Sequence, residues 1–275
     1  MSVAAIGKST KPKSHWLRVV LVSMVIGIIV NVLSGCSHFA THSYGHYEPI
    51  EHTGNYELAF LGFEQSVKPY VSVHKAHKKI IYSYANSAPP TIFSVFLLEH
   101  SEVKEGESVL DMGSGSGVLS IHAAEKASHI LATDISDEAL KGVELNARRY
   151  GVDNKIEVRK SNIFDAIGPD ETFDVMFVTV PYPYDERTQG LWELYERFFA
   201  GAPSRLNPKG RIYLMSGQLE NVPRVREMVL NNNLKIMRMD MSNDVKYLRE
   251  KIVYRIEHFP EELIGKTMKD PVRQD

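Results

Sequence analysis

Residues 109–121 read Val109-Leu-Asp-Met-Gly-Ser-Gly-Ser-Gly-Val-Leu-Ser-Ile121, and no other stretch of the sequence indicates a fold as strongly. Two apolar residues at its start predict a buried strand. The glycines that follow at alternate positions, Gly113, Gly115 and Gly117, let the backbone turn sharply and approach a ligand closely. The apolar run after Gly117 can open a helix, whose free N–H groups and positive dipole end favour a polar ligand. We therefore expect a nucleotide-like cofactor at this turn.

The spacing of the glycines indicates the kind of cofactor. A dinucleotide fingerprint, G-x-G-x-x-G, needs its third glycine at position 118, which is Val118 here, so a dehydrogenase is disfavoured. With Asp111 before the turn, the pattern resembles motif I of class I S-adenosylmethionine (SAM) methyltransferases, D/E-x-G-x-G-x-G, and the chain resembles the small-domain protein and rRNA methyltransferases from about residue 85 to 257. The resemblance implies SAM as cofactor. It places five residues of the turn around SAM: Asp111, Gly113, Ser114, Gly115 and Gly117.

A second match follows the next predicted strand, residues 129–134, which ends in Asp134. An acid at this strand end can accept hydrogen bonds from both ribose hydroxyls of a nucleoside. The resemblance implies that Asp134 and Ile135 contact SAM. The alternative for Asp134 is an N-cap of the helix that follows, but Ser136 already suits that position, and Gly151 ends the helix.

A third match lies at Asn162 and Ile163, after another short strand. The family commonly has an acid here that binds the adenine amino group. The amide oxygen of Asn162 can accept the same hydrogen bond, and Ile163 can supply an apolar wall and a backbone N–H. A plain turn is the alternative, because Asn favours turns.

A fourth match, Phe173-Asp-Val-Met-Phe-Val-Thr179-Val-Pro-Tyr182, resembles the F-D-x-I-x-x-N-P-P-Y motif of amino-group methyltransferases. Thr179 replaces the Asn of that motif and cannot reproduce its amide donor and acceptor pair, so the match departs at the residue that holds the methyl acceptor. The resemblance implies that Thr179 contacts SAM and that Thr179, Tyr182 and Asp185 are the catalytic candidates. A polar group of this loop could take a proton from the acceptor. The alternative is a proline-punctuated loop without chemistry.

The N-terminus has a different character. Residues 1–47 contain no Asp or Glu, and a basic start precedes the uncharged stretch 19–33, which is short for a membrane-spanning helix. The sequence Leu33-Ser-Gly-Cys36 resembles a bacterial lipobox, and Cys36 is the only cysteine. We therefore predict a lipoprotein-type signal segment over residues 1–35, lipidation of Cys36, and attachment to a membrane through Cys36 or an uncleaved segment.

These two predictions conflict, because an exported domain would lie where SAM is not supplied. A translation start further downstream would give a cytoplasmic enzyme instead. The second hypothesis is an exported lipoprotein that keeps the methyltransferase fold as a non-catalytic binding module. An aminopropyltransferase is a third, but the acids that would hold a polyamine are not evident.

Composition supports one domain with a sizeable core plus the N-terminal segment described above. The chain has 275 residues, 43% of them hydrophobic, and a net charge of −2, which gives no electrostatic case for nucleic acid. No spacing suggests a metal site. The fold class we expect is α/β, with a seven-stranded, mostly parallel, doubly wound sheet, a C-terminal antiparallel strand and helices on both faces. We predict a flexible tether over 36–56, N-terminal cap helices over 57–100, the SAM-binding domain over 101–260 and a tail over 261–275.

Overall fold

The computed structural model describes residues 50–51, 57–64, 71–244 and 249–260. All of them belong to one unit of the chain, Glu48–Asp275. The predicted signal segment, Cys36, most of the tether and the tail lie outside the described residues.

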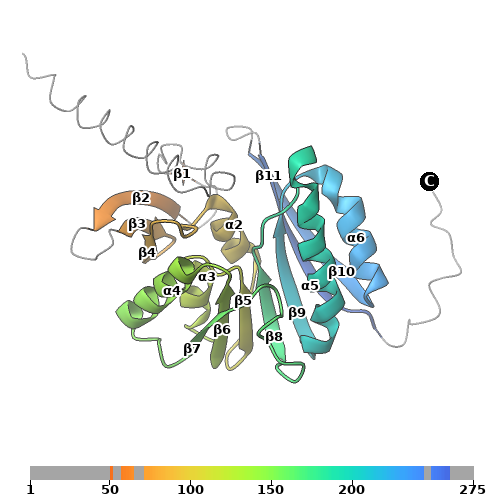
Figure 1. Cartoon of the computed structure of the whole chain (residues 1–275), viewed down its shortest axis with the longest axis horizontal. Coiled ribbons are helices and arrows are strands. Elements are labelled where there is room, and N and C mark those ends of the chain that lie inside the picture. Colours follow the sequence, from red (N-terminus) through yellow and green to blue (C-terminus); the bar gives the residue numbers. More distant parts are fainter. Residues whose placement is uncertain (1–49, 52–56, 65–70, 245–248, 261–275) are drawn as a thin grey trace, which may run out of the picture. The chain divides into compact units, whose positions relative to one another are not determined.

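A seven-stranded sheet forms the centre of this unit, as predicted (Figure 1). Its strands follow the order β10-β11-β9-β8-β5-β6-β7, in which β5 to β9 are parallel and β11 is antiparallel to both of its neighbours. The chain order reverses between β5 and β8, so ligands are expected at the carboxyl ends of these two strands. The strands are β5 (Ser108–Met112), β6 (His129–Asp134), β7 (Ile156–Lys160), β8 (Phe173–Val178), β9 (Leu206–Ser216), β10 (Leu234–Asp244) and β11 (Arg249–His258).

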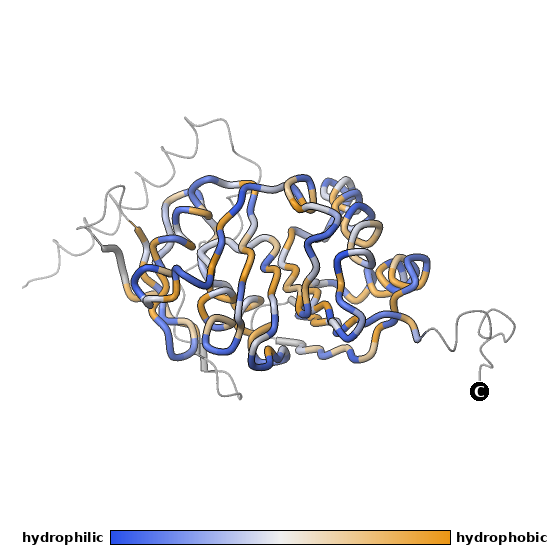
Figure 2. The backbone as a smooth tube through the Cα atoms, turned by 90° about the horizontal axis from the view of Figure 1, so that it is seen from below, coloured by the Kyte–Doolittle hydropathy of each residue, from blue (hydrophilic) through white to orange (hydrophobic). Residues whose placement is uncertain are grey.

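Helices cover both faces of this sheet. Successive strand residues point to opposite faces, so Val109 joins one core and Leu110 the other. The first core is shared with α2 (Ile92–His100), α3 (Val118–Ala123) and α4 (Asp137–Tyr150). The second is shared with α5 (Trp192–Arg205) and α6 (Val222–Asn231), which follow the short 3₁₀ helices η1 (Glu186–Leu191) and η2 (Leu219–Asn221). In Figure 2, hydrophobic segments run through the central strands, whereas hydrophobic and hydrophilic segments alternate along the helices.

The helix ends follow local signals in the sequence. Thr91 caps α2 in a reciprocal pair with Ser94, and the hydroxyl of Ser136 accepts a hydrogen bond from the N–H of Ala139 at the start of α4. Gly151 ends α4 in the left-handed conformation, with φ +64°. The N-cap predicted at Ser136 and the end of α4 predicted at Gly151 are therefore confirmed.

The prediction of cap helices over residues 57–100 is wrong except for α2. This region forms a second, antiparallel sheet in the order β1-β2-β3-β4. Its strands are β1 (Ile50–Glu51), β2 (Glu57–Glu64), β3 (Val71–Ala76) and β4 (Lys79–Tyr84). The physical reason is composition, since residues 71–84 are rich in Val, Ile and Tyr, which favour strands. Leu58, Ala76 and Ile81 on one face of this sheet join the first core, so the small sheet buries its own apolar side chains there.

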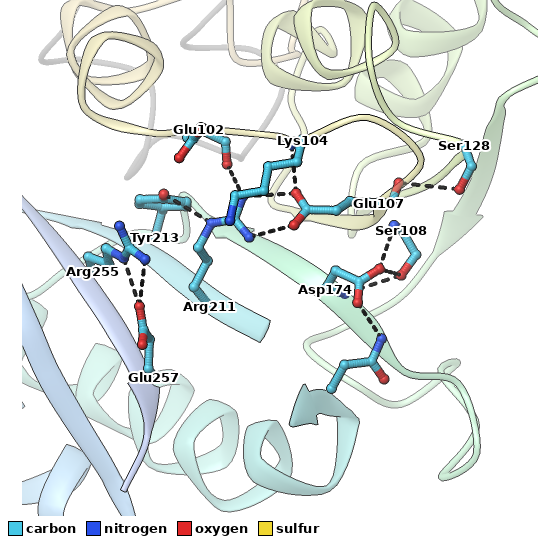
Figure 3. Close-up of polar contacts among 11 residues, drawn as sticks. Glu102, Lys104, Glu107, Ser108, Ser128, Asp174, Arg211, Tyr213, Arg255 and Glu257 are labelled. Atoms are coloured by element: carbon cyan, nitrogen blue, oxygen red, sulfur yellow. Dashed lines mark hydrogen bonds and ion pairs between the residues drawn. The ribbon is translucent and has the colours of Figure 1, made fainter. Parts of the chain in front are cut away.

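A polar network holds the amino ends of the central strands together (Figure 3). Both terminal nitrogens of Arg211 donate to the carboxylate of Glu107 at 2.8 Å, and Nη2 also donates to the carbonyl oxygen of Glu102 at 2.6 Å. Asp174 accepts from the N–H and the hydroxyl of Ser108, both at 2.9 Å, and from the amide of Asn207 at 2.7 Å. This network ties β5, β8 and β9 to one another at the edge away from the glycine turn.

Candidate active site

The three glycines after β5 have backbone conformations that other residues rarely adopt. Their φ angles are +77° at Gly113, +52° at Gly115 and +82° at Gly117. A Cβ at Gly113 would lie 3.0 Å from the carbonyl oxygen of Thr179, and one at Gly115 would lie 2.9 Å from that of Ala88. The turn is therefore both left-handed and tightly enclosed, which accounts for glycine at alternate positions.

Asp111, at the end of β5, is completely buried. Its Oδ2 accepts hydrogen bonds from the N–H of Ser120 at 3.0 Å and from the Ser120 hydroxyl at 2.6 Å, in the first turn of α3. Its Oδ1 has no partner. The pKa of Asp111 is raised to about 6, chiefly by burial and to a smaller extent by the charge of Asp134, while the bonds from Ser120 act in the opposite direction. A buried carboxylate oxygen left unpaired indicates that a donor from a ligand or water belongs there.

Asp134, at the end of β6, contacts the glycine turn from the neighbouring strand. Its Oδ2 accepts from the N–H of Gly115 at 3.0 Å, and its Oδ1 accepts from the N–H of Ser136, also at 3.0 Å. The side chain of Ile135, next to it, is 66% exposed. The structure thus brings Asp134 to the turn and leaves Ile135 exposed next to it, while the binding of SAM by both residues stays a prediction.

Asn162 and Ile163 follow β7, the next strand along the carboxyl edge. The side chain of Asn162 is exposed, and its backbone oxygen accepts a hydrogen bond from Arg197 of α5 at 3.2 Å. Ile163 is buried with φ +57°, a conformation that is unusual for a β-branched residue. Backbone strain of this kind persists only where the surroundings hold it, and such sites often bind ligands. Adenine binding by Asn162 and Ile163 stays a prediction.

Thr179, just after β8, makes its contacts with the glycine turn. Its hydroxyl donates to the carbonyl oxygen of Gly113 at 2.8 Å, and its N–H donates to that of Met112 at 3.0 Å. These two hydrogen bonds hold the carboxyl end of β8 against the glycine turn. The structure gives Thr179 a positioning contact, and the direct contacts with SAM and acceptor stay predictions.

Tyr182 and Asp185 occupy the loop beyond Thr179. The ring of Tyr182 lies edge-on to Phe93 of α2, with centroids 6.0 Å apart, and a Cβ at Gly217 would lie 2.5 Å from its hydroxyl oxygen. The carboxylate of Asp185 caps η1 and pairs with Arg187 at 2.6 Å, and these bonds, that of Arg187 first, hold the pKa of Asp185 below its usual range. Asp185 therefore shapes the loop, and its proposed role as a base is untested.

Several buried polar atoms around the turn lack a partner. They are Oδ1 of Asp111, the hydroxyls of Ser114 and Ser116, and the hydroxyl of Thr133. Leaving such a group unpaired costs about 1–3 kcal/mol, so natural proteins satisfy it with a ligand or water. A ligand that carries amino, carboxylate and ribose hydroxyl groups fits this set, and SAM carries all three.

Comparison with known proteins decides the family. A family model for the methyltransferase small domain matches residues 90–243, more than half of the 275 residues. The chain belongs to this family. The enzyme class and the SAM cofactor predicted for this methyltransferase domain are confirmed at the level of the family.

Similar proteins include methyltransferases that act on proteins, according to their names. The ribosomal protein L11 methyltransferase of Lactobacillus johnsonii is 33% identical over 130 residues, which cover 47% of this chain and 37% of that protein. The release factor glutamine methyltransferase of Cereibacter sphaeroides is 30% identical over 142 residues, which cover 44% of this chain and 50% of that protein. The methyltransferase domain thus spans half or less of the length of these relatives.

Solved structures support the same fold. Trm5b from Pyrococcus abyssi matches with a TM-score of 0.55 at 17% identity, over 74% of this chain and 64% of that chain. At this identity the match shows the shared fold alone.

The sequence interpretation missed buried residues of the methyltransferase domain that touch the turn, and one of them is Asn146. Asn146 of α4 is fully buried and donates to the carbonyl oxygen of Ser116 at 2.9 Å. The signal was present, because Asn146 stands beside the apolar stripe of Ala139, Val143 and Ala147 on the same helix, where a polar residue needs partners.

The predictions of lipidation at Cys36 and of membrane attachment concern residues that lie outside the described part of the chain. Within the part that the structure describes, no helix is long and apolar enough to cross a membrane. Likewise, the described residues hold no group of three or more His, Cys, Asp or Glu side chains placed to bind a metal ion. Lipidation of Cys36 and attachment to a membrane stay predictions.

Proposed function

We propose that this methyltransferase domain transfers a methyl group from SAM to a nitrogen or oxygen nucleophile of a protein or small molecule. The glycine turn and the unpaired polar atoms grouped beside it carry this proposal, because bound SAM would supply hydrogen-bond partners for them. The non-catalytic module is the competing hypothesis.

A protein acceptor is favoured by the similar proteins, whose names give ribosomal protein L11 and a release factor as targets. The loop after β8 limits which chemical groups can serve as the methyl acceptor. Thr179 replaces the amide-binding Asn, and its hydroxyl already donates to the carbonyl oxygen of Gly113. We therefore expect an amine or a hydroxyl as acceptor, rather than the planar side-chain amide of glutamine.

In this reaction the protein mainly positions SAM and the acceptor, and contributes less through acid–base chemistry. When bound, SAM supplies a methyl group on a positively charged sulfur, which leaves as a neutral thioether. Asp134 holds the N–H of Gly115, and Thr179 holds the carbonyl oxygen of Gly113, so the turn is rigid from two sides before a ligand arrives. The ring of Tyr182, fixed between Phe93 and Gly217, forms one wall of the acceptor side. An acceptor amine attacks through its lone pair and afterwards releases its proton to water.

The first experiment is a calorimetric titration of the purified protein with SAM and with S-adenosylhomocysteine. Micromolar binding of both supports a methyltransferase site. A folded protein that binds neither would reject the proposal and leave the non-catalytic module as the better hypothesis. Transfer of radiolabelled methyl groups to protein and small-molecule fractions then separates the two acceptor classes.

We also propose that Cys36 is lipidated and attaches the enzyme to a membrane. The support is the basic start, the apolar stretch 19–33 and the lipobox-like sequence before the only cysteine. Metabolic labelling with a fatty-acid analogue should label the native protein and not its Cys36→Ala variant. Unlabelled native protein in the cytoplasmic fraction would instead support a downstream start.

A further inference from the structure

The small sheet is attached to the methyltransferase domain through the edge of β4. Two side chains of α4 bond the backbone of this strand where a further strand would otherwise pair. The hydroxyl of Tyr150 accepts from the N–H of Ile80 at 2.7 Å and donates to its carbonyl oxygen at 3.2 Å. The amide of Asn146 accepts from the N–H of Tyr82 at 2.9 Å and donates to its carbonyl oxygen at 2.8 Å.

Asn146 differs from Tyr150 in one respect. Its amide nitrogen also donates to the carbonyl oxygen of Ser116 at 2.9 Å, and Ser116 lies between Gly115 and Gly117 in the turn. The side chain is completely buried and makes three hydrogen bonds. One amide group therefore joins the edge of the small sheet to the glycine turn.

The opposite side of Ser116 is held by the segment that leaves the small sheet. The N–H of Ser116 donates to the carbonyl oxygen of Ala88 at 3.2 Å. Ser87, just before Ala88, is bonded back to the carbonyl oxygen of Tyr84 at the end of β4 through both its N–H and its hydroxyl, at 3.1 Å and 2.8 Å. Both backbone polar groups of Ser116 thus depend on the docked position of β4.

We propose that Asn146 is a positioning residue for SAM, and that the small sheet sets the conformation of the cofactor turn through it. This inference rests on the proposed function, since it requires that SAM binds at the turn. If the docked sheet favours the SAM-binding conformation, SAM must favour the docked sheet by the same free energy. SAM binding and the docking of β4 are therefore coupled.

The test compares two variants of the full chain that weaken the same contact between α4 and β4. Tyr150→Phe removes the hydrogen bonds to Ile80 and leaves those of Ser116 intact. Asn146→Ala removes the bonds to both Tyr82 and Ser116. We expect both variants to lose stability, and only Asn146→Ala to raise the Kd for SAM, by about tenfold, or ~1.4 kcal/mol. Equal Kd values in the two variants and the native protein would overturn the inference.

A second measurement decides the matter if Asn146→Ala does not fold. In the native protein, saturating SAM should slow hydrogen exchange at the amide of Tyr82, while the amides of the β10–β11 hairpin, on the far side of the sheet, exchange as before. Unchanged exchange at Tyr82 in a protein that binds SAM would overturn the inference alone. Absence of SAM binding in the native protein would overturn the proposed function, and the inference with it.

Discussion

The polar side chains at the amino ends and at the carboxyl ends of the central strands, termed the amino edge and the carboxyl edge, differ in how completely they are hydrogen-bonded. At the amino edge, Arg211 donates both terminal nitrogens to the carboxylate of Glu107, and Asp174 accepts from Ser108 and Asn207 (Figure 3). At the carboxyl edge, Asp111 has one oxygen bonded to Ser120 and the other without a partner. The same strand, β5, joins these two edges. The paired groups at the amino edge serve the fold, and the unpaired oxygen of Asp111, beside the glycine turn, is available to a ligand.

The acids at the two edges show the same contrast in their pKa. Burial acts to raise the pKa of Glu107 and Asp174, yet the bonds from Arg211 to Glu107, and from Ser108 and Asn207 to Asp174, leave both below their usual range. Burial also dominates for Asp111, where the bonds from Ser120 are too few to compensate, and its pKa rises to about 6. Asp111 is completely buried whereas Glu107 and Asp174 are only partly buried, so burial and the number of bonds received act in the same direction to separate the two edges.

The largest expected effect is a loss of stability at the amino edge. Arg211→Ala leaves Glu107 half-enclosed without its cation, so we expect the free energy of unfolding to fall by about 3 kcal/mol, measured by urea denaturation. The Kd for SAM should stay within about twofold, because distant sites act independently. Arg255→Ala on β11 is the control, since its pair with Glu257 is about one third exposed on each side and should contribute less than ~1 kcal/mol. A large loss of SAM affinity in Arg211→Ala would show that the two edges are not separate.

The next effect concerns pH at the carboxyl edge. The unfolded chain ionises Asp111 near its ordinary pKa, while the native protein keeps it protonated up to about pH 6. The native state therefore binds more protons in this window, and its stability falls as pH rises from about 4 to about 6, by about 2–3 kcal/mol. Urea denaturation of Asp111→Asn should lack this component, so the difference between variant and native protein should change across the window. A constant difference would contradict the raised pKa.

Asp134→Ala tests directly whether SAM contacts the carboxyl edge of the sheet. Loss of the carboxylate frees the N–H of Gly115 and removes the predicted ribose ligand, so the Kd for SAM should rise about 30-fold, or ~2 kcal/mol, in a folded protein. Asp137→Ala is the matched control, because Asp137 pairs with Lys160 on the surface and should leave the Kd unchanged. Unaltered calorimetric affinity in Asp134→Ala would remove Asp134 from the site.

The smallest effect compares one glycine from each edge. Gly106, near the amino edge, has φ +79° with nothing near its missing Cβ, whereas Gly115 has φ +52° and the carbonyl oxygen of Ala88 at 2.9 Å. Gly106→Ala should cost about 1 kcal/mol of stability from backbone strain alone and leave the Kd for SAM unchanged. Gly115→Ala should cost at least as much and also weaken SAM binding, because the turn must shift. Equal SAM affinity in both variants would show that the close approach of Ala88 has no role in the site.

Local chemistry allowed much of this molecule to be predicted from the sequence. The glycine spacing, the acids at the ends of β5 and β6, the cap at Ser136 and the end of α4 at Gly151 all involve residues that are near in sequence. Their conformations depend on backbone sterics and on hydrogen bonds within a few positions, which the residue types themselves specify. The same signals were weakest for residues 57–84, where strands form by pairing with each other and the prediction of helices was wrong.

Tertiary structure alone decided which distant residues meet at the turn. Asn146 reaches Tyr82 across 64 positions, and Thr179 reaches Gly113 across 66. The sequence shows that Asn146 is a polar residue and that Thr179 stands where the family motif has Asn. It does not show which carbonyl oxygen each side chain bonds. By itself the sequence determined a parallel α/β domain with a SAM-type turn, because glycine spacing and strand ends are local. Only the folded chain decided that a small antiparallel sheet holds that turn, because those hydrogen bonds form after distant strands have packed together.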